Sequence, residues 1–293
     1  MKPTTRGNLW MLVAGLFFAC MGALVKIGSQ KFCSNELVFY RSLFGLCTIF
    51  IMTRHRHKSL ATPYLKLHLS RSLLGFASLA LYFYAITCLP LALAVTLNYT
   101  APLFLAALTL HYMPRQSKPI LLFAIGLGFV GVALLLQPGV QGGKWLPTLL
   151  GLGSGLLAGI AYRQITQLGQ LGEPEWRTVF YFTLVCSVGS CLWMLMHPFH
   201  SVTLPDLELL FAMGACATLA QLAMTRSYRN GEPLVAASLA YSTVILSSAF
   251  GFMLWHETLS MSGWAGVAII VISGIVSLAY SAGFDKSVQA PTL

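Results

Sequence analysis

Ten apolar stretches follow one another along the chain, and each is close to the roughly 20 residues that an α-helix needs to cross a bilayer. Short breaks with turn-forming residues separate them, for example "CLPL" at Cys88–Leu91 and "RNGEP" at Arg229–Pro233. Of 293 residues, 57% are hydrophobic and 9% are charged, which is too few charges to cover a soluble protein of this length. We therefore predict an all-α membrane protein with ten transmembrane helices, surrounded by the lipid bilayer. The expected spans are Leu9–Ile27, Glu36–Met52, Ser70–Cys88, Leu91–Tyr112, Pro119–Gln137, Leu146–Leu168, Trp176–His197, Leu207–Tyr228, Pro233–Trp255 and Met261–Ser281.

The first span has some features of a secretion signal, because Lys2 and Arg6 precede an apolar run that contains "FFAC" up to Cys20. The run continues to Ile27, which is longer than the apolar part of a usual signal peptide. We therefore expect the first helix to be retained in the protein.

Lysine and arginine are distributed unevenly over the predicted loops, and this bias sets the orientation in the membrane. With a cytoplasmic amino terminus, Lys31 and Lys144 lie outside, joined by Lys26 and Arg177 only if the helix ends are drawn generously. The other loops hold twelve cations, and both termini are therefore predicted to be cytoplasmic. These twelve are Lys2, Arg6, Arg54, Arg56, Lys58, Lys66, Arg71, Arg115, Lys118, Arg226, Arg229 and Lys286. The net charge of +10 follows from this bias, and no nucleic-acid partner is predicted because the cations do not form a stripe.

The second half of the chain repeats the first after a shift of 141 or 142 positions. The shift pairs "ELVFYRSL" (Glu36–Leu43) with "RTVFYFTL" (Arg177–Leu184), and "LALAVTLNYTAP" (Leu91–Pro102) with "PLVAASLAYSTV" (Pro233–Val244). Each half has five predicted spans, an odd number, so the second half enters the membrane from the opposite side. Inverted-topology repeats of this kind are typical of secondary transporters, whose substrate site lies between the halves.

The loops agree with the inversion. The segment Thr53–Lys66 is rich in cations, whereas its counterpart His197–Glu208 contains neither lysine nor arginine. We expect a first repeat at 1–140, a second repeat at 141–284 and a short cytoplasmic tail at 285–293. Five helices per half can enclose a path without a partner, so we expect a monomer.

Three segments resemble the EamA family of ten-helix permeases, which belongs to the drug/metabolite transporter (DMT) superfamily. They are "GLFFACMGALVK", "LYFYAITCLPLALAVTLNYTAPLFLAAL" and "MTRSYRNGEPLVAASLAYSTVILSSAFGFMLWHE". The resemblance covers essentially the whole chain. It implies an inner-membrane transporter of small metabolites, often an exporter, with a central cavity between the halves. Substrates vary widely within the family, so the resemblance does not identify one.

Two cations within the predicted spans are candidate substrate ligands, because ionisable groups are costly inside a membrane. Lys26 shares a helix face with Gly15, Ala19 and Gly22, and it either faces a cavity or extends to the outer interface from a helix end. Arg41 binds an anionic group or pairs with Glu36. Its counterpart in the repeat is Phe182, so the repeat itself does not require the charge. That difference favours a functional role for Arg41.

Polar and aromatic side chains within the spans complete the candidate site, with helix–helix hydrogen bonding as the alternative role for each. Pro102 lies near the middle of the fourth span, where a proline kinks the helix and frees a carbonyl group. Its counterpart is Val244, so this kink is expected in one half only. The candidate substrate-binding residues are Lys26, Arg41, Tyr82, Asn98, Tyr99, Tyr162, Gln164, Gln221 and Tyr241.

The positions of the carboxylates bear on the substrate. Glu36 and Glu257 lie at helix ends within reach of water, so we expect a neutral to positive cavity. This favours an anionic, zwitterionic or neutral amphipathic metabolite, moved by alternating access in an exporter or exchanger. The alternative is a proton-coupled multidrug exporter, which is expected to hold a buried carboxylate. Coupling to protons stays open.

Two further classes are less favoured. A channel does not explain the similar inverted halves, and an intramembrane enzyme would need a reactive dyad or a metal set. The chain has neither a GxSxG elbow nor a Walker A loop, and we predict no catalytic residue, metal or cofactor. A disulfide between Cys33 and Cys88, both expected on the outer side, stays open.

Overall fold

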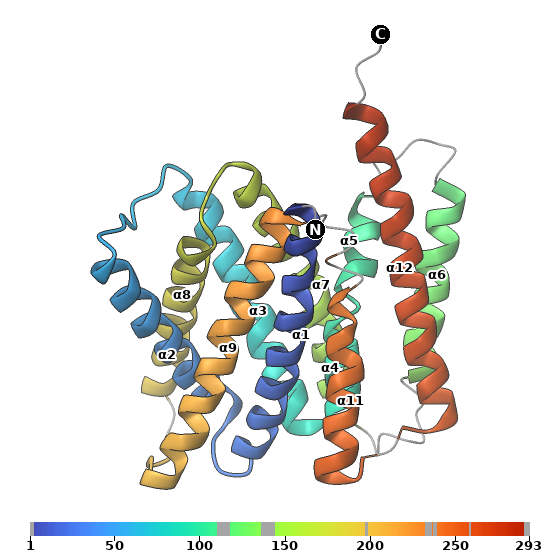
Figure 1. The fold of residues 1–293 in the computed structure, drawn as a ribbon. Coiled ribbons are helices and arrows are strands. Elements are labelled where there is room, and N and C mark those ends of the chain that lie inside the picture. The colour runs from blue at the N-terminus through green and yellow to red at the C-terminus, as the bar shows by residue number, and fades with distance from the viewer. Residues whose placement is uncertain are drawn as a thin grey trace.

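A computed structural model describes residues 3–109, 118–135, 144–196, 199–231, 236, 239–257 and 259–289. These residues form a bundle of helices, and the described part of the chain contains no strand (Figure 1). The helices are α1 Pro3–Gly28, α2 Ser34–His55, α3 Leu65–Cys88, α4 Leu91–Asn98, α5 Ala101–Thr109, α6 Lys118–Leu135, α7 Trp145–Gln170, α8 Glu175–Leu195, α9 Leu204–Asn230, α11 Ser242–Trp255 and α12 Met261–Gln289.

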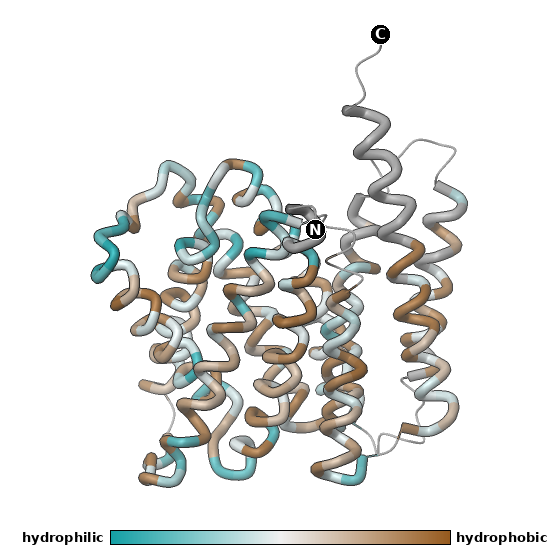
Figure 2. The backbone as a smooth tube through the Cα atoms, in the orientation of Figure 1, coloured by the Kyte–Doolittle hydropathy of each residue, from teal (hydrophilic) through white to brown (hydrophobic). Residues whose placement is uncertain are grey.

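Six of the described helices are long and apolar enough to cross a membrane, namely α1, α2, α3, α7, α8 and α9. Shorter apolar helices cover Leu91–Phe104, Ser242–Trp255 and Met261–Ser273. Hydrophobic residues occupy the middle of the bundle and hydrophilic residues gather at its two ends (Figure 2). The predicted all-α, multi-pass membrane class is therefore confirmed, whereas ten complete spans are not established by the described residues.

The two halves run in opposite directions. The start of α1 lies against the end of α9, because a Cβ added at Gly7 would be 2.6 Å from the carbonyl carbon of Asn230. The start of α7 lies beside the end of α3, where Lys144 Nζ donates a 2.8 Å hydrogen bond to the Cys88 carbonyl oxygen. Helices α1 and α7 thus begin at opposite ends of the bundle, and the start of α1 and the end of α12 share one end (Figure 1).

Helix contacts between the halves follow the same symmetry. Helix α1 packs on α9, and the equivalent contact of the other half joins α7 to α3. Helices α2 and α8 pack on each other, as do α6 and α12, which form a pair to one side of the bundle (Figure 1). The space between the halves is lined by α1, α3, α4, α7, α8 and α9.

The fourth predicted span is two helices instead of one kinked helix. Helix α4 ends at Asn98 and α5 begins at Ala101, two residues after Tyr99, which caps α4. Pro102 has no N–H to donate to the carbonyl group of Asn98, four residues earlier, so the helical pattern cannot continue across this point. Tyr241, the counterpart of Tyr99, also lies at a helix end, directly before α11. Both tyrosines are therefore held where the regular helix is interrupted.

Two arginines lie elsewhere than predicted. Arg71, counted as a loop cation, is in the second turn of α3 and is 2% exposed. Arg177, assigned to the outer side under generous helix ends, donates a 2.9 Å hydrogen bond to the Ser59 carbonyl oxygen in the α2–α3 loop. It therefore lies at the end of the bundle where the cations concentrate, because α8 begins there.

Candidate functional site

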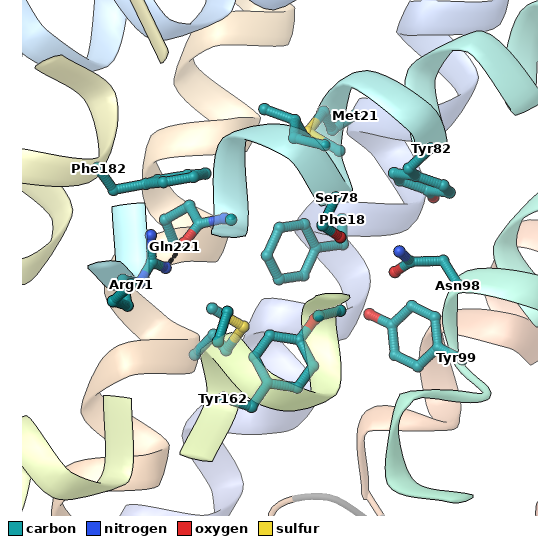
Figure 3. Close-up of a pocket in the computed structure, with 15 residues that line it drawn as sticks. Phe18, Met21, Arg71, Ser78, Tyr82, Asn98, Tyr99, Tyr162, Phe182 and Gln221 are labelled. Atoms are coloured by element: carbon teal, nitrogen blue, oxygen red, sulfur yellow. Dashed lines mark hydrogen bonds between the residues drawn. The ribbon is translucent and has the colours of Figure 1, made fainter. Parts of the chain in front are cut away.

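A cavity lies between the two halves, lined by side chains of α1, α3 and α4 from the first half and α7, α8 and α9 from the second (Figure 3). Its empty volume is about 560 Å³ including the part that is open to the outside. The cavity is therefore a partly open space that both halves enclose.

Five of the predicted site residues line this cavity together: Tyr82, Asn98, Tyr99, Tyr162 and Gln221. They come from α3, the α4–α5 break, α7 and α9, so residues far apart in the sequence meet at one place. The break at Tyr99 directs this side chain and Asn98 toward the cavity (Figure 3). The arrangement offers hydroxyl and amide groups on an otherwise apolar wall, as small-molecule sites commonly do.

Hydrogen bonds hold part of this set in place. Asn98 Nδ2 donates to Ser154 Oγ on α7 over 2.9 Å, and the Tyr99 hydroxyl donates to Thr243 Oγ1 on α11 over 2.9 Å. The Tyr162 ring stacks on Tyr228 with 5.6 Å between ring centroids. The same side chains therefore line the cavity and hold neighbouring helices together, because each of these contacts joins two helices beside the cavity.

Arg71 is a charged residue of the cavity lining that was not among the predicted site residues. Its Nη2 is 3.5 Å from Gln221 Oε1, and its guanidinium carbon lies 4.1 Å from the centroid of the Phe182 ring. Its Nε and Nη1 have no hydrogen-bond partner in the described part of the chain. The sequence contains a signal for this position, because Arg71 lies inside the predicted span Ser70–Cys88. It was counted with the cations of the preceding loop.

Arg41 lies next to this cluster, behind the cavity wall. It is 1% exposed, and its guanidinium carbon is 5.6 Å from the Phe182 centroid and 6.0 Å from the Phe83 centroid. The expected alternative, a pair with Glu36, does not form. Glu36 instead accepts hydrogen bonds from the His200 backbone N–H at 2.6 Å and from the Cys33 N–H at 2.7 Å.

Besides Arg41, three further predicted site residues are not among those that line the cavity. Lys26 forms an ion pair with Glu257 at the end of α1, and its Nζ also lies 3.3 Å from the Leu89 carbonyl oxygen. Gln164 Nε2 donates a 2.8 Å hydrogen bond to Ser70 Oγ. Tyr241 is buried, and its hydroxyl has no hydrogen-bond partner among the described residues.

The carboxylates with described partners lie near helix ends. Glu257 pairs with Lys26, Asp206 with Lys31 and Glu175 with Arg229. None of the described cavity-lining residues is an aspartate or a glutamate. The cavity wall formed by these residues therefore carries positive charge, from Arg71.

Glu173 connects two loops at the end of the bundle where the chain begins. It accepts hydrogen bonds from Thr62 Oγ1 at 3.0 Å and from Arg177 Nη1 at 2.9 Å, and His68 Nε2 lies 3.0 Å away. Burial raises the pKa of Glu173, but these hydrogen bonds and the charge of Arg177 outweigh burial and hold the pKa below its usual value. The carboxylate therefore ties the α2–α3 loop to the start of α8.

The described cysteines are all free thiols. Cys33 and Cys88 are both free, so the structure does not pair them. Burial raises the pKa of the Cys33 thiol. Within the described ranges, no group of three or more histidine, cysteine, aspartate or glutamate side chains is arranged to hold a metal ion.

Comparison with known proteins gives one family. The sequence model of the EamA-like transporter family matches residues 5–137 and again residues 145–279. The chain is similar to the pseudopaline exporter CntI of Pseudomonas aeruginosa, with 26% identity over 92% of this chain and 94% of that protein. It is also similar to a riboflavin transporter of Brucella anthropi, with 23% identity over 86% of this chain and 90% of that protein. An S-adenosylmethionine uptake transporter of Rickettsia felis is 21% identical over 96% of this chain and 95% of that protein. One solved crystal structure superposes with a TM-score of 0.67 at 18% identity, covering 98% of this chain and 99% of that one, which shows the same fold.

Proposed function

This chain belongs to the EamA-like transporter family, so it is a membrane transporter and not an enzyme, and we propose that it carries a small metabolite by alternating access. The cavity between the halves is the proposed substrate site. The observation that carries this proposal is that helices of both inverted halves line the cavity. Rocking of one half against the other would open such a site to each side of the membrane in turn.

The proposed substrate is small and anionic, zwitterionic or neutral amphipathic. Tyr82, Asn98, Tyr99, Tyr162 and Gln221 would contact it, because their polar groups reach the cavity from both halves. The absence of aspartate and glutamate from the described cavity lining disfavours a proton-coupled exporter of cationic drugs. The relatives' printed names, pseudopaline exporter, riboflavin transporter and S-adenosylmethionine uptake transporter, support a small metabolite as the substrate class.

The proposed transport is export or exchange across the inner membrane. Both termini are proposed to lie in the cytoplasm, because the helix ends at that end of the bundle carry cations, which favour the cytoplasmic side. These cations are Arg6, Arg54, Lys66 and Arg229. A monomer is the proposed functional unit, because the cavity is enclosed by helices of a single chain.

The roles of the remaining candidates follow from their surroundings. We assign Lys26 to the ion pair with Glu257 and Gln164 to the contact between α7 and α3. The break before Pro102 would let α4 and α5 move separately. Tyr241 holds the equivalent position in the second half. Its hydroxyl has no partner among the described residues and would become available to a substrate if α11 moved.

The test is counterflow of labelled amino acids and other small metabolites into proteoliposomes, with and without a pH gradient. A carrier gives saturable counterflow of at least one compound, and Asn98→Ala or Tyr162→Ala weakens it. A pH gradient that leaves this flux unchanged would argue against proton coupling. Flux that does not saturate would indicate a channel, and absence of counterflow for every compound would refute the proposed transport.

A further inference from the structure

We propose that Arg71, supported by the charge of Arg41 behind the cavity wall, forms an anion subsite that binds an oxyanion group, a carboxylate or a phosphate, of the transported metabolite. The inference rests on the proposed function and narrows the substrate class to compounds that bear an anionic group.

Both guanidinium groups lie against the same aromatic ring. Arg71 and Arg41 lie 4.1 Å and 5.6 Å from the centroid of Phe182. Both side chains are almost completely buried, at 2% and 1% exposure. They approach from α3 and α2 in the first half, while Phe182 comes from α8 in the second. The cluster therefore lies at the interface between the halves, where a substrate of an alternating-access carrier is bound.

The charge of this cluster is not balanced by the described part of the protein. Neither arginine forms an ion pair there, and the buried carboxylates Glu36 and Glu173 are engaged by other partners. A buried charge is costly unless it is paired, and the cost is greatest inside a membrane. Cation–π contacts with Phe182 reduce this cost only in part. A bound anion would supply the missing charge.

Free donors point to the same conclusion. Arg71 Nε and Nη1 lack partners among the described residues, as does Arg41 Nε, and the one hydrogen bond of Arg71, to Gln221, is long at 3.5 Å. Nε and Nη1 lie on different edges of the guanidinium group, and each shares its edge with Nη2. Nη2 has two N–H bonds and uses one for Gln221, so its other N–H and one of the free donors can together face the two oxygens of a carboxylate or phosphate. Gly75 leaves room beside Arg71 Nη1, because a Cβ there would lie 3.2 Å from this nitrogen.

The cavity has a second, uncharged wall. Figure 3 shows Arg71, Gln221 and Phe182 on one side and Tyr82, Asn98 and Tyr99 on the other. An anionic group at the first wall would place the rest of the molecule against hydroxyl and amide groups at the second. The site thus fits a compound with an anionic end and a polar, uncharged remainder.

The experiment measures binding to purified protein in detergent, by thermal unfolding followed through tryptophan fluorescence. Succinate, succinamate and succinamide are matched in size and carry two, one and no carboxylates, and methylphosphonate tests phosphate-like groups. Variants Arg71→Gln and Arg71→Lys are compared with Arg163→Gln, which removes one cation at an exposed position of α7. Arg41→Gln tests the second arginine.

We expect stabilisation to increase from the diamide to the dicarboxylate in the wild type. Arg71→Gln should weaken the apparent affinity for succinate about tenfold or more, because an ionic hydrogen-bonded pair is lost. Arg71→Lys should recover part of the affinity, and Arg163→Gln should leave it unchanged. The comparison of succinate with methylphosphonate shows which oxyanion the site prefers, and preference for either supports the inference.

A second readout separates this role from a structural one. Without ligand, Arg71→Gln should unfold at the same or a higher temperature than the wild type, because an uncompensated buried charge is removed. An arginine that only held the helices together would give a lower temperature. Equal stabilisation by succinate and succinamide, or equal affinity in Arg71→Gln and Arg163→Gln, would overturn the subsite. Such a result would leave the proposed transport intact, since counterflow is measured separately in proteoliposomes.

Discussion

Arg41 lies over the ring of Phe182, with 5.6 Å between the guanidinium carbon and the ring centroid, and the two residues occupy equivalent positions of the two repeats. Equivalent positions can meet because α2 and α8 pack on each other between the halves. One repeat has an arginine at this position, and the other has an aromatic ring that contacts it. The contact is compatible with a charge in one copy only, because two arginines facing each other here would repel.

The first prediction exchanges these two residues. Phe182→Arg alone should lower the unfolding free energy by about 2–4 kcal/mol, because a third cation joins Arg41 and Arg71 in a buried place. The double variant Arg41→Phe with Phe182→Arg should unfold at a higher temperature than Phe182→Arg, since it returns the number of cations to two. Thermal unfolding in detergent measures both. A double variant no more stable than Phe182→Arg would contradict the pairing of these positions.

The second prediction concerns the contact between α7 and the break of α4. A Cβ at Gly155 would clash with Thr100 Oγ1 and would lie 2.7 Å from the Leu97 carbonyl oxygen. Backbone cannot move aside as a side-chain end can, so Gly155→Ala should cost about 1–3 kcal/mol of unfolding free energy. Gly153→Ala is the matched control, because its Cβ would meet nothing closer than 3.7 Å. The control should be neutral or up to about 1 kcal/mol more stable, and equal effects of the two changes would refute the close contact.

The third prediction assigns Lys26 to structure. Lys26→Met leaves the Glu257 carboxylate with the Leu91 N–H, which lies 2.8 Å away, as its remaining hydrogen-bond donor in the part of the chain that the structure describes. We expect a loss of about 1–3 kcal/mol in unfolding free energy, less than for a fully buried pair because water reaches this helix end. Adding Glu257→Gln should restore part of the loss, and succinate affinity should not change. Loss of anion binding without loss of stability would instead return Lys26 to the substrate site.

The fourth prediction is a pH dependence that arises from Glu173. Its pKa in the folded protein lies below the ordinary value of 4.5. The stabilisation is therefore complete above that value and is lost as the pH falls through the lower folded pKa. Glu173→Gln should be less stable than the wild type at neutral pH, and the difference should shrink below pH 4.5. His68 and Arg177 face this carboxylate and are present in both proteins.

The control for the pH series is Glu208→Gln, which changes an exposed carboxylate on α9. Urea or thermal unfolding at several pH values measures the difference for each variant. A Glu173→Gln difference that stays constant from neutral to acidic pH would show that the carboxylate does not stabilise the loops in its charged form.

The sequence by itself determined the class of the protein and the layout of its halves. Apolar stretches of bilayer length can satisfy their backbone hydrogen bonds only as helices, and the half-length repeat predicted inverted halves with a site between them. The interior position of five polar residues was predictable, because polar groups within apolar spans have few favourable places except the interior. These residues are Tyr82, Asn98, Tyr99, Tyr162 and Gln221.

Only the tertiary structure decided which cations face the cavity. Lys26 pairs with Glu257, 231 positions away, whereas Arg71 reaches Gln221, 150 positions away, without meeting a carboxylate in the described part of the chain. A sequence shows that a charge is present in or near a span. Whether that charge meets an acid, a ring or an open space depends on the neighbouring helices, and those contacts form only when the two halves pack together.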